Sequence, residues 1–239
     1  MQYSTEQIMG ERYSRHTMLP QIGDEGQQRL HEASVLLVGV GGLGSPIALY
    51  LAASGVGRIG LIDADVVSES NLQRQVLYKE CEIGKLKVEC AKSRLKELNS
   101  EITVDIYPTR FDATSARELV SKYDIVVDGC DNFATRYLID DTCAELNKPY
   151  VYGSIGEFHG QASLFNYQGG MRYRTLFPDE KALTQRPSKV MGVMGVVPGV
   201  VGCIEATEVI KVITGCGTTL RNRLYTIDLL TMQSNILEL

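Results

Sequence analysis

Hydrophobic and polar positions follow two different patterns along the chain. Up to about residue 155, short apolar runs typical of buried strands alternate with segments that have apolar residues at helical spacing. The strand-like runs are 34–40, 58–63, 103–110, 124–130 and 150–156. The helix-like segments are 5–15, 24–33, 45–55, 84–99, 114–123 and 132–148. This order predicts an α/β fold with a doubly wound, mostly parallel sheet.

After residue 155 the pattern is typical of antiparallel strands. Segments 160–167 and 171–177 alternate apolar and polar residues around a turn at 168–170, and 223–230 and 233–239 resemble a closing hairpin. We predict a loop at 178–190 and a helix at 199–215. The whole chain, 1–239, is thus expected to form one domain in three parts. These are N-terminal helices (1–33), a nucleotide-binding half (34–155) and a half that holds a second substrate (156–239).

Composition and charge exclude several classes of protein. Hydrophobic residues make up 44% of the chain and charged residues 22%, as in ordinary globular proteins. The net charge of −5 gives no general reason to bind nucleic acid or an anionic membrane. The apolar stretch 190–204 contains a proline and is shorter than the ~20 residues that span a bilayer. The N-terminus lacks the apolar core of a signal peptide, so we expect a cytoplasmic protein.

A glycine-rich turn follows the first strand-like run. Its glycines, Gly39, Gly41 and Gly44 with Gly42 between them, match G-x-G-x-x-G, and Asp63 comes nineteen residues after Gly44 at the end of the second run. In a Rossmann-like sheet this arrangement cradles a phosphate at a helix start and offers a carboxylate to ribose. The alternative is a glycine-rich turn that binds nothing.

Polar residues cluster after Asp63. Asn71, Arg74 and Gln75 lie in the connection 64–78, and Lys87 opens the next helix-like segment. Two cations and an amide close to a phosphate loop fit a triphosphate, whose charge must be neutralised during attack at the α-phosphorus. Each residue alone is also consistent with a solvated side chain.

Two aspartates follow the fourth strand-like run, at the sheet edge where ligands bind in such folds. Asp128 and Asp131 facing a triphosphate would repel it unless a carboxylate holds Mg²⁺. Asp131 is also a candidate N-cap for the helix that starts near residue 132.

Histidines are few, and their positions disfavour reduction of a carbonyl. His16 and His31 precede the glycine turn, and His159 lies in a predicted turn between strands, so no acid–base pair is evident. Attack of an ionised carboxylate on an α-phosphate needs no base, only positioning and cations.

These motifs, in this order, resemble the ThiF/MoeB/HesA family. The similarity is carried by GVGGLGSP, LIDADVVSESNLQRQ, GKLKVE, DGCDN, GQASLFNY and GVVGCIEATEVIKVITG. The resemblance implies adenylation, with ATP and Mg²⁺, of the C-terminal glycine of a ubiquitin-fold sulfur carrier that ends in Gly-Gly. A sulfur donor then yields a thiocarboxylate. It further implies the site residues: Asp63 for ribose, Asn71, Arg74, Gln75 and Lys87 for the nucleotide, and Asp131 for Mg²⁺. Family members are usually homodimers, and Arg15 is the candidate to reach the other subunit's triphosphate.

Two departures from the family pattern matter. Arg172 and Thr175 stand where many relatives have the first of two cysteine pairs that bind zinc, and the second pair is missing. The six cysteines form no C-x-x-C pair, so we predict no zinc site and a C-terminal hairpin held by packing alone. The crossover loop 178–190 has no cysteine for a covalent bond to the carrier. Four of its polar residues either contact the carrier tail or stay solvated: Lys181, Gln185, Arg186 and Lys189.

The preferred interpretation is an adenylyltransferase for the carrier of thiamine thiazole synthesis. The close alternative is activation of the small subunit of molybdopterin synthase. An NAD-dependent dehydrogenase, a non-catalytic scaffold and an enzyme acting on a transfer-RNA nucleoside are less well supported by the residues above.

Overall fold

The computed structural model describes residues 11–185 and 192–239. Eight strands form one sheet in the order β3-β2-β1-β4-β5-β6-β7-β8. Strands β1 (Ser34–Val38), β2 (Arg58–Ile62), β3 (Thr103–Tyr107), β4 (Ile125–Asp128) and β5 (Tyr150–Gly156) are parallel to their neighbours among these five. β6 (His159–Phe165), β7 (Arg223–Asp228) and β8 (Gln233–Glu238) continue the sheet antiparallel. The predicted fold class is confirmed.

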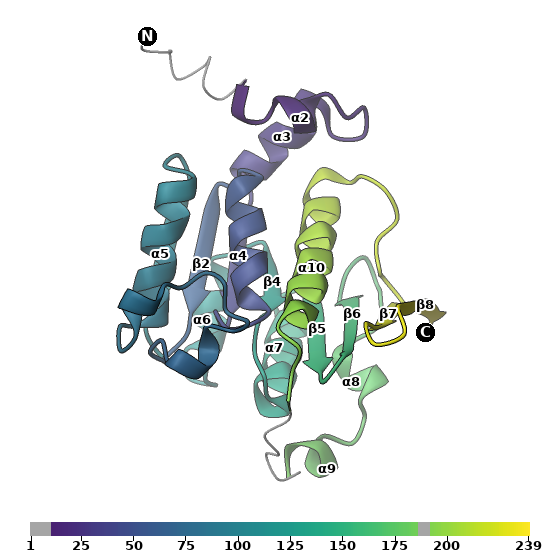
Figure 1. Cartoon of the computed structure of the whole chain (residues 1–239). Coiled ribbons are helices and arrows are strands. Elements are labelled where there is room, and N and C mark those ends of the chain that lie inside the picture. Colours follow the sequence, from purple (N-terminus) through teal and green to yellow (C-terminus); the bar gives the residue numbers. More distant parts are fainter. Residues whose placement is uncertain (1–10, 186–191) are drawn as a thin grey trace.

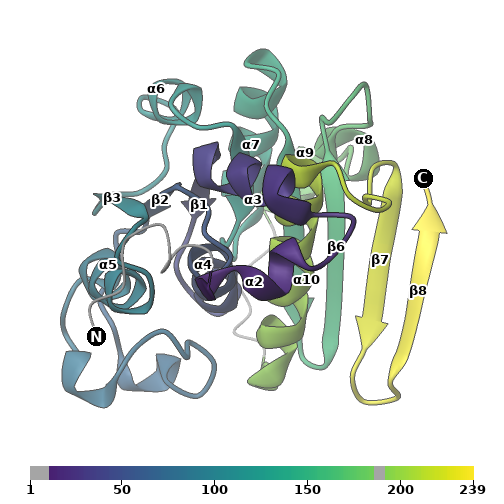
Figure 2. The same cartoon turned by 90° about the horizontal axis from the view of Figure 1, so that it is seen from above.

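Helices cover both faces of this sheet (Figures 1 and 2). One face carries α4 (Gly44–Ala53), α5 (Lys87–Leu98) and α10 (Val196–Thr214), whose apolar residues form the larger core. The other face carries α6 (Ala116–Ser121), α7 (Phe133–Glu145) and α8 (Tyr173–Leu176) over a cluster rich in tyrosine. Short helices are α2 (Ser14–Thr17), α9 (Glu180–Thr184), η1 (Glu69–Asn71) and η2 (Glu80–Glu82), and α3 (Gly23–Glu32) joins α2 to β1.

Two segments differ from the sequence prediction. The segment 171–177, expected to be a strand, contains α8 because Tyr173 is buried against Tyr137 and its N–H donates to Asp140 at 2.9 Å. The expected loop 178–190 begins with α9, whose N-cap Asp179 accepts the N–H of Ala182 at 2.9 Å. The rest of that loop, with Arg186 and Lys189, lies outside the described residues.

Ion pairs also occur in the C-terminal half. Arg223 on β7 pairs with the exposed Glu238 on β8 at 2.8 Å, so packing is not the only side-chain contact in the hairpin. Arg172, at one of the positions discussed for zinc, donates to Asp140 and Asp141 at 3.0 and 2.7 Å. These pairs tie the segment that carries α8 to the helix α7.

The sheet changes direction of winding between β1 and β4, and there the two backbones touch. Gly129, after β4, donates its N–H to the carbonyl of Val38 at 2.8 Å. A Cβ on Gly129 would lie 2.1 Å from the carbonyl oxygen of Gly39, which has φ +92°. A Cβ on Gly44 would lie 2.3 Å from that same oxygen. Side chains at these positions would force the turns apart.

Substitution of Gly44 tests this contact. Gly44→Ala should lower the free energy of unfolding by about 1–3 kcal/mol, because the new methyl overlaps the Gly39 carbonyl. Gly199→Ala is the matched control, since Gly199 also lies in a helix but has open space around its Cβ position. The control should be neutral or up to about 1 kcal/mol more stable. Urea unfolding measures both, and equal effects of the two variants would contradict the prediction.

Helix α10 carries a buried carboxyl group under the parallel strands. Glu205 is fully buried beside Gly153 of β5, and neither carboxyl oxygen has a hydrogen-bond partner among the described residues. Burial, together with nearby Asp128, raises the pKa of Glu205 well above its ordinary value, whereas Arg136 opposes the shift. Burial without a hydrogen-bond partner therefore favours the neutral form of this group in the folded protein.

The raised pKa of Glu205 predicts a loss of stability with rising pH. In the unfolded chain a glutamate ionises near pH ~4.3, so above this pH the free energy of unfolding falls until the folded-state pKa is passed. Glu205→Gln should remove this fall, giving a larger gain in urea stability at about pH 8 than at about pH 5.

Glu208 on the same helix supplies the control for this pH effect. It is buried too, but it accepts the N–H of Leu220 at 2.6 Å and pairs with Lys211. Glu208→Gln should therefore destabilise the protein at both pH values. A pH profile of Glu205→Gln that runs parallel to the wild-type profile would show that Glu205 ionises normally in the folded state.

Candidate active site

The glycine turn 39–43 leads from β1 into α4 at the carboxyl edge of the sheet. Tyr78 closes it from one side, because its buried hydroxyl donates to the carbonyl of Val40 at 2.6 Å. Burial raises the pKa of Tyr78, so this donor stays protonated. Pro198 near the start of α10 lies against Gly42, with its Cβ 3.3 Å from the position of an added Cβ. The turn is thus held on two sides, and neither Tyr78 nor Pro198 was a predicted site residue.

Asp63 lies next to this turn, as predicted from the spacing. One of its carboxylate oxygens accepts the N–H of Val40 at 2.9 Å, and the other accepts the N–H of Asp65 at 2.8 Å. Asp63 is half-buried, and each carboxylate oxygen has a second lone pair. It therefore holds the glycine turn and can still accept a hydrogen bond from a ligand hydroxyl.

The connection after β2 brings two predicted residues against the glycine turn. Arg74 is half-buried, and its Cδ lies 3.7 Å from the Cβ position of Gly42. Gln75 is buried, and its Nε2 lies 3.6 Å from the Cβ position of Gly41. The Oε1 atom of Gln75 has no hydrogen-bond partner within the described ranges. An unpaired buried amide oxygen beside a phosphate-type loop is the kind of group that a ligand hydroxyl or amino group satisfies.

Asn71 shapes this connection. Its side-chain Oδ1 accepts the N–H of Ser68 at 3.2 Å, and its carbonyl accepts the N–H groups of Arg74 and Gln75 at 3.0 and 2.9 Å. The guanidinium of Arg74 donates to the carbonyl of Ser70 at 2.9 Å. Asn71 thus orients Arg74 and Gln75 through its carbonyl, and its side chain remains partly exposed.

Lys87 begins α5 and is buried, with 5% of its surface exposed. Its ammonium donates to Asp65 at 3.0 Å, whereas the Asp65 side chain is 68% exposed. Asp65 also receives support from Asp63 through its own N–H. Asp65 was not a predicted site residue, although it lies only two residues after Asp63.

The two aspartates after β4 have different environments. Asp128 is fully buried, and both of its oxygens accept hydrogen bonds from protein groups, so it is not open to a ligand. Asp131 is exposed in the turn that contacts Gly39 through Gly129. The N-cap of α7 is Asn132, which accepts the N–H of Thr135 at 2.9 Å, so the capping alternative for Asp131 is wrong.

Arg15 is the predicted site residue that the fold does not bring to this edge within one chain. It is exposed on α2, which lies with α3 beyond the opposite end of the sheet (Figures 1 and 2). Tyr13 fixes this region by accepting a hydrogen bond from Asn99 at 2.8 Å.

Across residues 11–185 and 192–239, no three His, Cys, Asp or Glu side chains are grouped to hold a metal ion. All six cysteines are free. No helix in the described part of the chain has the length and apolarity to cross a membrane.

The chain is similar in sequence to curated adenylyltransferases. The chain is 49% identical over 216 residues to a probable molybdopterin-synthase adenylyltransferase of Porphyra purpurea, covering 89% of this chain and 56% of that protein. It is 44% identical over 236 residues to the sulfur carrier protein adenylyltransferase of Thermus thermophilus, covering 96% and 86%. The chain spans about half the length of several other curated relatives that it matches.

Solved structures agree with the fold. The E. coli MccB structure with ATP superposes with a TM-score of 0.81 and 28% identity, covering 95% of this chain and 71% of that one. The ThiF family matches residues 13–239. The family resemblance inferred from the motifs is therefore confirmed: the chain belongs to the ThiF family.

Proposed function

We propose that this chain adenylates the C-terminal glycine of a ubiquitin-fold sulfur carrier, using ATP and Mg²⁺ and releasing pyrophosphate. The observation that carries the proposal is the grouping of Arg74 and Gln75 on the glycine turn, with Asp63 and Lys87 on its flank. The names of the relatives, adenylyltransferases of molybdopterin synthase and of a sulfur carrier, support the same reaction.

The residues present fit ATP. In the proposal Asp63 binds the ribose, and the unpaired Gln75 amide and Asn71 bind next to it. Arg74 and Lys87 hold the phosphates, with Lys87 leaving Asp65 to do so. Gly39, Gly41, Gly42 and Gly44 provide the turn against which the phosphates lie. Asp131 would hold Mg²⁺, which supplies charge neutralisation when bound with ATP.

The reaction needs little more than positioning. The carrier's terminal carboxylate is ionised at neutral pH and forms a bond from its oxygen to the α-phosphorus. The bond from that phosphorus to the bridging oxygen breaks, and pyrophosphate leaves with the electron pair. Arg74 and Lys87 stabilise the negative charge that builds up on the phosphates. No general base is required.

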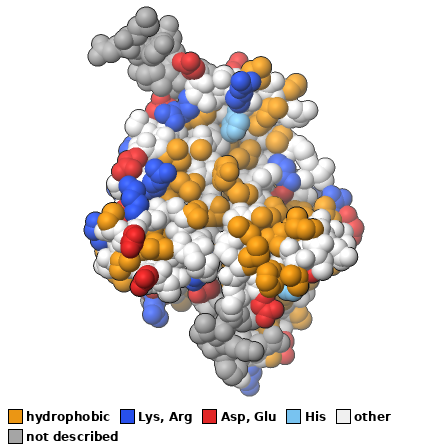
Figure 3. Space-filling model, in the orientation of Figure 1, with side chains coloured by type: hydrophobic (Ala, Val, Ile, Leu, Met, Phe, Trp, Pro, Cys, Tyr) orange, Lys and Arg blue, Asp and Glu red, His pale blue; other side chains and the backbone are white. Residues whose placement is uncertain are grey.

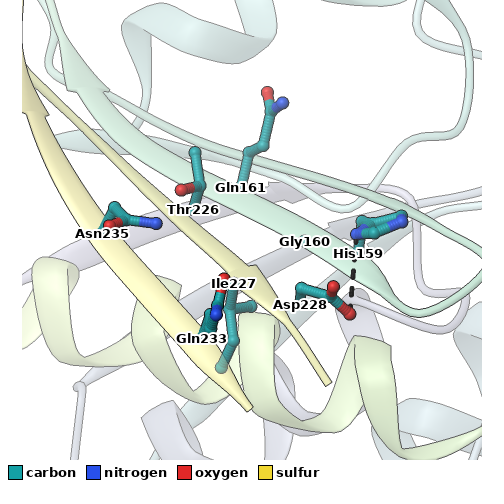
Figure 4. A pocket seen from close by; sticks show the side chains of 8 residues that line it. All are labelled: His159, Gly160, Gln161, Thr226, Ile227, Asp228, Gln233 and Asn235. Carbon is teal, nitrogen blue, oxygen red and sulfur yellow. Dashed lines mark ion pairs between the residues drawn. The ribbon is translucent and has the colours of Figure 1, made fainter. Parts of the chain in front are cut away.

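We place the carrier on the antiparallel strands. A hollow of about 240 Å³ is lined there by residues of β6, β7 and β8, which are polar except for Gly160 and Ile227 (Figure 4). Gln161, Thr226 and Asn235 are cross-strand neighbours there, and His159 and Asp228 lie 3.8 Å apart at one end. We assign this polar sheet face to the carrier, with the thiamine-pathway carrier preferred and the molybdopterin-synthase subunit as the alternative.

The decisive experiment is Mg²⁺-dependent exchange of labelled pyrophosphate into ATP, with each candidate carrier. Exchange that requires one carrier supports the proposal and identifies the pathway. Lys87→Ala should lower kcat/KM by about 10²–10³-fold, since it removes a buried phosphate ligand. Lys85→Ala is the control, because Lys85 is exposed two residues away, and it should change the rate by no more than about twofold. Absence of exchange together with tight NAD binding would favour a dehydrogenase.

We also propose that Arg15 acts across a homodimer. The face that carries α4 and α10 exposes apolar side chains, among them Tyr50, Met194 and Val196 (Figure 3). A two-fold dimer through such a face would allow α2 of one subunit to approach the other's site.

Mixing two inactive variants tests this arrangement. Arg15→Ala and Arg74→Ala should each lose most exchange activity, because each removes a phosphate ligand. In a randomised mixture half of the dimers are mixed and carry one intact site each, so about a quarter of the sites should regain activity. A mixture that exchanges subunits, as shown by native mass spectrometry, but stays inactive would refute sharing of sites.

A further inference from the structure

A buried ion pair lies under the turn that carries Asp131. Asp128 ends β4 and is fully buried, and Arg136 on α7 is 5% exposed. The Nε of Arg136 donates to the carboxylate of Asp128 at 3.0 Å, and the hydroxyl of Tyr150 donates to the same oxygen at 2.9 Å. The second oxygen of Asp128 accepts the N–H of Cys130 at 2.9 Å. Every oxygen of this carboxylate is thus engaged by the protein.

Arg136 completes a clamp around Cys130. Its Nη2 donates to the carbonyl of Cys130 at 3.1 Å and to the carbonyl of Gly153 on β5 at 3.3 Å. One ion pair therefore fixes both the N–H and the carbonyl of the residue directly before Asp131. It also ties this turn to the neighbouring strand.

The opposite side of the same turn lies on the glycine turn. Gly129 donates to Val38 at 2.8 Å, and its Cα is so close to the Gly39 carbonyl that no side chain fits. Asn132 caps α7 immediately after Asp131. The backbone on both sides of Asp131 is thus held, while its carboxylate remains exposed.

Stability alone does not explain such a pair. Replacing a buried ion pair by apolar residues of similar volume is often neutral or stabilising, because burial costs both charges their hydration. The Asp128–Arg136 pair instead binds three backbone groups and the hydroxyl of Tyr150. Such an arrangement is suited to fixing the position of the turn 129–131.

We infer that Asp128 and Arg136 are positioning residues that hold Asp131 at a set place relative to the glycine turn, so that it can share one Mg²⁺ with the phosphates of ATP. This inference rests on the proposed function. It gives the buried aspartate a role through the backbone of Cys130, distinct from that of a metal ligand. The chemical basis is that groups supporting a metal ligand commonly change metal affinity by about 10–100-fold.

The test compares ATP binding with and without Mg²⁺ by titration calorimetry. In Asp128→Asn with Arg136→Gln, which leaves no uncompensated charge, the gain in ATP affinity caused by Mg²⁺ should shrink by about 10–100-fold. Affinity for metal-free ATP should stay within about twofold, because the phosphate ligands are untouched. The Mg²⁺ concentration for half-maximal exchange should rise by the same factor. Arg136→Lys, which keeps the charge but loses the forked contacts, should show the same direction and serves if the double variant does not fold.

A second pair on α7 provides the matched control. Asp140 is also fully buried, and Arg172 donates to it at 3.0 Å, but this pair contacts α8 and not the turn 129–131. Asp140→Asn with Arg172→Gln should lower the melting temperature and leave the Mg²⁺ effect unchanged.

The possible outcomes separate the positioning role from the proposed function. A folded Asp128/Arg136 variant with wild-type Mg²⁺ dependence overturns the inference, as does an equal loss in the Asp140/Arg172 control. Wild-type protein that binds Mg²⁺ and ATP but shows no carrier-dependent exchange contradicts the proposed function. In that case the calorimetric comparison of the variants still decides whether Asp128 and Arg136 position Asp131. Wild-type protein that does not bind ATP contradicts both.

Discussion

The site depends on how closely two backbone turns approach each other at the carboxyl ends of β1 and β4. Gly39 and Gly129 touch there because neither has a side chain. The sheet reverses its winding at this point, which is where ligands bind in doubly wound folds. Phosphate-type donors on one turn and the exposed Asp131 on the other therefore form a single unit. A side chain at either glycine would force the two turns apart.

Two buried carboxyl groups near this unit have different environments. On the α7 face, Asp128 meets Arg136, a tyrosine hydroxyl and a backbone N–H. On the α10 face, Glu205 lies against Gly153 with no hydrogen-bond partner among the described residues. The first carboxylate is compensated by hydrogen bonds and an ion pair, whereas the second favours a proton because nothing offsets the cost of its burial. Of the two, Glu205 is the group whose raised pKa makes stability fall as pH rises.

The local patterns were enough to predict the parallel half and the glycine turn with Asp63, because these features follow from periodicity and short spacing. The strand expected at 171–177 failed because Tyr173 packs on α7 and its N–H meets Asp140, contacts between residues distant in sequence. Alternation along β4 places Asp128 on the same face as the buried Val126, a signal of burial that the sequence prediction did not use. Its partner Arg136 could be found only from the fold. The same holds for the distance of Arg15 from the glycine turn.

The pairing of Lys87 with Asp65 affects how a nucleotide would enter. Lys87 is almost enclosed, and its charge is already balanced by the exposed Asp65 before any anion arrives. A phosphate that takes over Lys87 releases Asp65 into water, so one ion pair is exchanged for another. The net gain of charge pairs is then smaller than the number of cations in the site. The rate of nucleotide association should consequently depend less steeply on ionic strength than it would if Arg74 and Lys87 were both unpaired cations.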